Sequence, residues 1–153
     1  MGVTLLFEEI NQFKYIFLDD VKEEDGYNLV LSLCSGAISE IPEDFILAGV
    51  TFKDTRRITR NEHVRLEVIF PGYVAFNIIN ESFVVPNSHD EFTGSKAREY
   101  TKSRYLEYIQ NETKATAIWP GQLRHFGFCC EWQIIDVISK DVPAVKVVDT
   151  RIG

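Results

Sequence analysis

Residues 27–34 read YNLVLSLC and residues 64–70 read VRLEVIF, and these two stretches decide the fold. In both, apolar side chains occupy every second position, which is typical of a β-strand that buries one face. The apolar face of the first stretch consists of Tyr27, Leu29, Leu31 and Leu33. In the second stretch, charged residues lie on the opposite face. This two-residue period predicts half-buried strands of an antiparallel sheet.

Turn signals place further strands beside these two. Asp25-Gly26 precedes the first stretch and predicts a hairpin with an alternating strand at residues 13–18. Pro71-Gly72 follows the second stretch and predicts a hairpin with the apolar run at 73–79. Five more runs read as strands: residues 45–52, 83–85, 123–130, 131–139 and 145–148. The run at 131–139 is long enough for a helix, but its β-branched residues favour a strand.

A single helical pattern lies at residues 101–111. Its apolar residues are spaced i, i+3 and i+4, which gives a narrow stripe on a charged segment. They are Tyr105, Tyr108 and Ile109. Thr101 or Ser103 can cap the start of this helix. Because helices do not separate the strands, parallel topology with helical crossovers is disfavoured.

The chain has 153 residues, of which 45% are hydrophobic and 25% charged, as in ordinary globular domains. We therefore expect one domain over residues 1–153. The predicted fold class is α+β and predominantly β. Its antiparallel sheets are expected to fold as a sandwich or a partly open barrel, with one short helix near 101–111.

Charge is distributed unevenly along the chain. The net charge is −7, and the first 50 residues carry ten acidic and two basic residues. Such an excess of acid repels phosphate backbones, so nucleic-acid binding is not expected. It attracts a basic protein partner instead. The plainer interpretation is that the acidic run forms a solvated face.

The expected location is the cytoplasm. The three cysteines, Cys34, Cys129 and Cys130, are an odd number without a disulfide pattern, which suits a reducing compartment. The first ten residues lack the basic start of a secretory signal. No apolar run approaches the ~20 residues of a membrane span, so no membrane association is expected.

No motif indicates chemistry, and we predict neither catalytic residues nor a metal or cofactor. Phosphate-loop and dinucleotide fingerprints are missing, and the histidines lie far apart in sequence. His125 and Cys129 are four residues apart, which on a strand separates them by about 13 Å. The loop run His89-Asp90-Glu91 is a weak candidate for acid/base work, although such loops are commonly plain connectors.

The favoured function is binding to another protein without catalysis. The segment from residue 19 to residue 26 is predicted to be an exposed loop with an acidic surface. Its acidic residues are Asp19, Asp20, Glu23, Glu24 and Asp25. One specific form is an immunity- or antitoxin-like inhibitor that mimics a polyanion and blocks a basic partner.

Two further functions remain open. A small-ligand or enzymatic domain would need an aromatic-lined pocket, for which Tyr73, His125 and Trp132 are the candidates. The other is a structural assembly or homodimer, in which exposed alternating strands near the termini pair between chains. Separately, the basic residues of segment 53–60 are expected to complement the acidic N-terminal half, either within one molecule or in a dimer mate.

Overall fold

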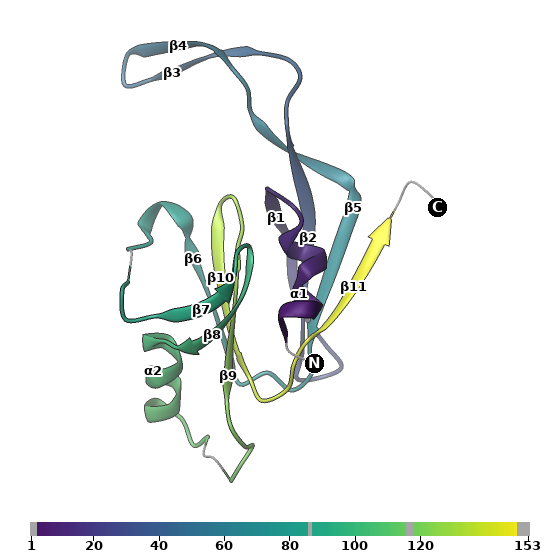
Figure 1. The fold of residues 1–153 in the computed structure, drawn as a ribbon, viewed down its shortest axis with the longest axis vertical. Coiled ribbons are helices and arrows are strands. Elements are labelled where there is room, and N and C mark those ends of the chain that lie inside the picture. The colour runs from purple at the N-terminus through teal and green to yellow at the C-terminus, as the bar shows by residue number, and fades with distance from the viewer. Residues whose placement is uncertain (1–2, 86, 116–117, 150–153) are drawn as a thin grey trace.

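The computed structural model describes residues 3–149, except residues 86 and 116–117. Figure 1 shows two antiparallel sheets packed against each other, with a two-stranded hairpin reaching away from one end. The first sheet has the order β1 (Ile16–Glu24), β2 (Asn28–Ile38), β5 (Ile58–Phe70) and β11 (Ala144–Asp149). The second has the order β6 (Ala75–Asn80), β10 (Gln133–Ser139), β9 (Arg124–Cys129), β8 (Ala97–Lys102) and β7 (Glu91–Gly94). The hairpin consists of β3 (Glu43–Leu47) and β4 (Val50–Thr55).

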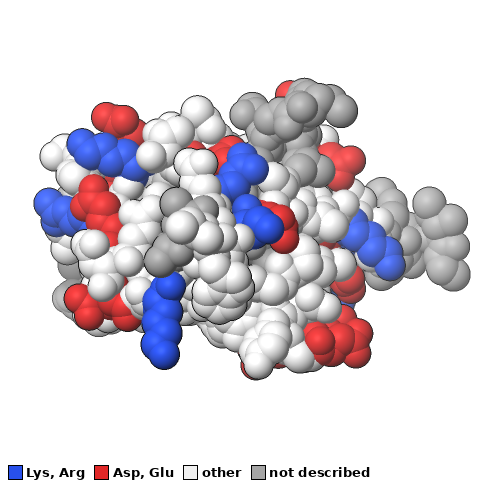
Figure 2. Space-filling model, turned by 90° about the horizontal axis from the view of Figure 1, so that it is seen from below, with Lys and Arg blue, Asp and Glu red and all other residues white. Residues whose placement is uncertain are grey.

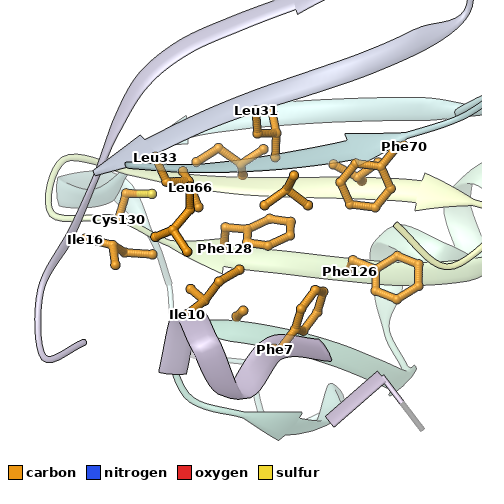
Figure 3. Packing of buried hydrophobic residues seen from close by; sticks show 14 of the residues in the cluster. Phe7, Ile10, Ile16, Leu31, Leu33, Leu66, Phe70, Phe126, Phe128 and Cys130 are labelled. Carbon is orange, nitrogen blue, oxygen red and sulfur yellow. The ribbon is translucent and has the colours of Figure 1, made fainter. Parts of the chain in front are cut away.

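The predicted fold class is confirmed, because the chain is mainly antiparallel β and its sheets form a sandwich rather than a closed barrel. The apolar side chains of β2 and β5 face those of β9 and β10 across the core (Figure 3). Leu31, Leu66 and Phe128 are fully buried there. Tyr27 was expected on the same face as Leu31, but it lies in the β1–β2 turn and is 79% exposed.

A second helix, α1 (Val3–Asn11), corrects the expectation of a single helix. Phe7 and Ile10 from α1 are buried in the core, and the Phe7 ring lies 5.5 Å from that of Phe128. Asn11 ties the helix end to β8, since its side chain accepts from the Ala97 amide at 2.7 Å. The strand predicted at 13–18 consequently begins later and extends further, as β1.

The helix α2 (Arg104–Glu112) confirms the predicted helix, and Ser103 rather than Thr101 is its N-cap. The run 131–139 is a strand, β10, as favoured. The strand predicted at 83–85 does not form, because a short 3₁₀ helix, η1 (Glu81–Phe83), occupies its start. Among the described residues, no helix combines the length and the hydropathy needed to cross a membrane.

The single strand predicted at 45–52 is two strands joined by a tight turn. Ala48 and Gly49 both have positive φ, 51° and 79°. Two consecutive residues with positive φ form the kind of turn that reverses a chain within a two-residue hairpin loop. The apolar run therefore doubles back on itself and projects from the sandwich instead of joining a sheet (Figure 1).

Candidate interaction surface

The β3–β4 hairpin has one apolar face. Its register places Phe45 opposite Phe52 and Leu47 opposite Val50, and residues opposite each other share a face of a sheet. The two phenylalanine rings lie 6.1 Å apart. The four side chains are nevertheless 47%, 47%, 60% and 55% exposed in that order. We call these four residues the hairpin face.

Arg60 anchors the base of the hairpin to the sandwich. Its guanidinium lies 5.4 Å from the ring centre of Phe17 and 5.1 Å from that of Trp132. The same group pairs with Asp19 at 3.5 Å and donates to the Leu18 carbonyl. Cations over aromatic faces are attracted by the ring electrons. These contacts fix the base of the β3–β4 hairpin to β1 and to the β9–β10 turn.

Two other basic residues of segment 53–60 also have partners within this chain. Arg57 pairs with Glu43 across the hairpin at 2.8 Å. Arg56 donates to the carbonyls of Ser39 and Glu40. The expected complementarity between this segment and the acidic N-terminal half therefore occurs within one molecule.

The five acidic residues do not form an exposed loop, which corrects that expectation. Four of them lie on strand β1, and Asp25 lies in the turn that follows with a φ of 49°. The register pairs Ile16 with Ser35 and Glu24 with Asn28, so the acids run along the strand away from the hairpin. The prediction missed the strand because these side chains carry no apolar alternation.

Three of these five side chains already have partners. Asp19 pairs with Arg60, Glu24 pairs with Lys22 at 2.8 Å, and Glu23 accepts a hydrogen bond from the Tyr73 hydroxyl. Asp20 only accepts from the neighbouring Val21 amide. Figure 2 shows acidic and basic groups mixed on the end of the molecule seen from below. That these acids bind a partner stays a prediction.

The three pocket candidates are not brought together. Tyr73 lines a cavity of about 480 Å³ with Tyr27 and Pro120. Trp132 is 57% exposed and packs edge-on against Phe17. His125 lies in neither place, because it is buried beneath α2.

His125 is the centre of a buried polar network that sequence reasoning missed. Its Nε2 lies 2.7 Å from the Asp136 carboxylate, and its Nδ1 lies 2.7 Å from the Ser103 hydroxyl. The carboxylate can only accept, so Nε2 carries the proton; Nδ1 of a neutral ring then accepts from Ser103. The Ser103 oxygen in turn accepts from the Leu106 amide and caps α2. No local spacing signals this network, because β8–α2, β9 and β10 each supply one member.

Aromatic rings enclose the network. The Tyr100 ring stacks on His125 at 4.0 Å, and Tyr105 meets it edge-on at 5.5 Å. Gly127 makes room for the stack, since a Cβ there would lie 2.8 Å from the Tyr100 ring. Burial raises the pKa of Tyr100, and that of Tyr105 to about 12.

A serine, a histidine and an aspartate in a hydrogen-bonded chain resemble a nucleophile with its base. Here, however, Ser103 is 1% exposed and His125 is 2% exposed. The serine oxygen is also engaged by the helix amide of Leu106. The arrangement therefore accounts for the position of α2 and supports no nucleophilic attack on a bound substrate.

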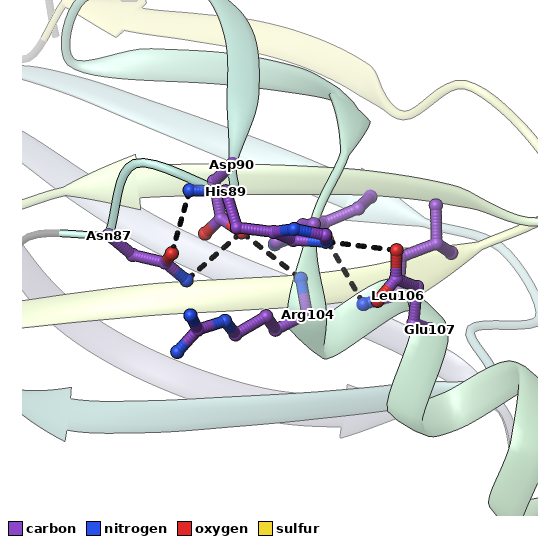
Figure 4. Close-up of polar contacts among 8 residues, drawn as sticks. Asn87, His89, Asp90, Arg104, Leu106 and Glu107 are labelled. Carbon is purple, nitrogen blue, oxygen red and sulfur yellow. Dashed lines mark hydrogen bonds and ion pairs between the residues drawn. The ribbon is translucent and has the colours of Figure 1, made fainter.

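The loop at 87–90 docks on the same helix (Figure 4). The Asp90 carboxylate accepts from the Arg104 amide at 3.0 Å, and His89 Nε2 lies 2.9 Å from the Glu107 carboxylate. Asn87 orders the loop by accepting from the His89 amide. The weak acid/base candidate thus has a structural explanation, which is attachment of the loop to the first turns of α2.

The thiols are poorly suited to nucleophilic chemistry. Burial, reinforced by the charge of Asp19, raises the pKa of Cys34 to about 11. Burial likewise raises the pKa of Cys129 and of Cys130. A nucleophilic cysteine needs the opposite shift. Among residues 3–149, leaving out those not described, no group of three potential metal ligands occurs.

The raised pKa of Tyr105 makes stability depend on alkaline pH. In the unfolded chain this hydroxyl ionises near pH 10, whereas in the folded chain it holds its proton to about pH 12. The folded state therefore binds more protons between these values, and stability falls as pH rises through them. We expect Tyr105→Phe to lose less stability over this window in urea denaturation. Tyr108→Phe is the matched control, because Tyr108 is on the same helix and 60% exposed. Equal losses in the two variants would contradict the expectation.

Comparison with family models, with curated proteins and with solved structures gave no match. Function is therefore inferred from the geometry alone.

Proposed function

We propose that this chain is a non-enzymatic protein-binding domain that engages its partner through the hairpin face. The supporting observation is the exposure of Phe45, Leu47, Val50 and Phe52 together on one side of a projecting arm. An isolated two-stranded hairpin is only marginally stable in water. Burying a large apolar side chain fully contributes roughly 1.5–3 kcal/mol, so covering four half-exposed ones contributes several kcal/mol to binding.

The charge of the chain suits a basic partner. A net charge of −7 attracts an oppositely charged protein and raises its rate of encounter. Asp20, Glu23 and Asp25 are the acids of the predicted surface for which no ion pair is found among the described residues, and Glu23 accepts a hydrogen bond from the Tyr73 hydroxyl. The proposed division of roles is that the hairpin face holds the partner while the acids on and after β1 steer it. An immunity- or antitoxin-like inhibitor is the specific form of this proposal.

The test is binding to purified basic proteins encoded beside this chain in its genome, measured by isothermal titration calorimetry. We expect one of them to bind, and Phe52→Lys to weaken that binding by about 100-fold or more, as for a central apolar contact. Thr51→Lys is the matched control. Thr51 is the adjacent residue of β4 and lies on the opposite face, opposite Ile46, so its replacement is expected to leave binding unchanged.

A charge-reversed chain, Asp20→Lys with Asp25→Lys, separates the effect of charge on the association rate from the effect of the hairpin face on affinity. Its association rate should fall at low salt and match that of the unchanged chain at high salt, where charges are screened. The hairpin proposal is wrong if Phe52→Lys binds as tightly as Thr51→Lys, or if none of the basic proteins binds.

One observation favours a small-ligand function as the second candidate. A cleft of about 810 Å³ adjoins the buried network and is lined by Lys102, Gln110 and Lys140. Crystals soaked with fragments would distinguish the two, because a ligand function requires density in this cleft and the hairpin proposal does not.

A further inference from the structure

Three of the four outer strands of the sandwich carry features that hinder pairing with another chain. β1 has a bulge at Asp19 and an outward row of charges. β7 has four residues and an irregular register. β11 carries the exposed Lys146 at its middle. Bulges, short length and charges, especially lysine, are the usual protections of an edge strand.

The fourth outer strand, β6, has none of these protections. Its sequence, AFNIIN, contains no charge and no proline, and its register with β10 is continuous over all six residues. Phe76, Ile78 and Ile79 are 37%, 40% and 38% exposed. Figure 1 shows β6 at the outer edge of its sheet. An uncharged edge without a bulge, with exposed apolar side chains, is a template for another strand.

We propose that β6 pairs antiparallel with β6 of a second copy of this chain. The sheet that contains β6 in one copy then continues into the same sheet of the other copy. This goes beyond the proposed binding of a partner at the hairpin. Residues that lie opposite each other on two paired strands point to the same face of the sheet. Phe76 and Ile78 point to the same face of β6, so they can lie opposite each other. Centring the two-fold axis on Asn77 places Phe76 of each copy opposite Ile78 of the other, with the two Asn77 side chains opposite each other.

The sequence of β6 and the surface around it favour a second copy as the occupant. The strand carries no charge, so two copies can pair along it without placing like charges opposite each other. The strand is also self-complementary over residues 75–79, because a two-fold axis on Asn77 matches apolar to apolar and amide to amide. The apolar surface continues past β6 to Phe83 of η1 and to Val84 after it, which are 77% and 45% exposed.

The solution mass of the full chain tests this proposal by sedimentation equilibrium from micromolar to near-millimolar concentration. The expected mass is that of two chains, and Ile78→Lys should lower it twofold by placing a lysine at each side of the axis. Val147→Lys on β11 is the matched control, since Val147 is 47% exposed on another outer strand, and it should leave the dimer intact. Circular dichroism shows whether each variant is folded.

Amide hydrogen exchange of the unchanged chain provides a second measurement that needs no variant. Exchange along β6 is expected to slow as concentration rises, while exchange along β7 stays constant. The proposal is overturned if the unchanged chain has the mass of one chain throughout. It is also overturned if a folded Ile78→Lys chain keeps the dimer mass, or if exchange along β6 is independent of concentration.

Discussion

Replacing Phe126 by alanine is expected to lower the free energy of unfolding by about 3–5 kcal/mol, the usual cost of removing a buried phenylalanine side chain. Phe126 is fully buried, and it joins three parts of the fold. Its ring lies 6.0 Å from that of Phe7 in α1 and 5.6 Å from that of Phe70 in β5. Its removal therefore leaves a cavity between both sheets and the first helix.

Equilibrium unfolding in urea measures this loss. Phe83→Ala is the matched control, because Phe83 is 77% exposed and its truncation should change stability by about 0.5 kcal/mol or less. Amides of α1 should also exchange faster in the Phe126→Ala chain, since the helix loses a main contact. A loss no larger than that of Phe83→Ala would mean that the sheets are not packed as described.

Replacing Asp136 by alanine is expected to cost about 1–3 kcal/mol, because it leaves a buried donor without an acceptor. The donor is Nε2 of His125, which is 2% exposed and sits 2.7 Å from the carboxylate. The loss of stability should extend to α2, because the other ring nitrogen of His125 is hydrogen-bonded to Ser103, the N-cap residue of that helix.

Asp136→Asn is the matched control, because an amide oxygen can still accept from Nε2. It should retain most of the stability that Asp136→Ala loses in urea denaturation. Nitrogen NMR of the unchanged chain should show that Nε2 of His125 carries a proton. Equal stability of the alanine and asparagine variants would show that the hydrogen bond contributes nothing.

The strands that were predicted most accurately have strict alternation. Leu31 and Leu66 follow a period of two, and both are fully buried in the core as that period predicts. Val30 and Cys34, on the other face of β2, are also buried, which the period did not predict. The helix α2 was also predicted, from the spacing of Tyr105 and Ile109. By contrast, α1 was missed because a helix of nine residues is too short for its apolar period to stand out in the sequence.

The sequence predicted an acidic binding surface but did not predict the hairpin face, because residues 45–52 were interpreted as one ordinary strand. The acids at 19–25 and the apolar run at 45–52 are evident in the sequence. The structure gives both segments another role than expected. Asp19 forms an ion pair with Arg60, and the turn at Ala48-Gly49 folds the apolar run into the projecting β3–β4 hairpin. Neither contact follows from a local pattern.

The sequence by itself determined the antiparallel strands, the helix α2 and the net negative charge, because each depends on local periodicity or on a count of residues. It did not determine which strands pair: the hairpin predicted at Pro71-Gly72 does not form, because β5 and β6 belong to different sheets. Only the tertiary structure decided which side chains meet. Ser103, His125 and Asp136 are separated by 22 and 11 positions, and strand pairing brings them within hydrogen-bond distance. The same pairing left the hairpin face and β6 uncovered, since exposure depends on what packs nearby and no single segment encodes its own neighbours.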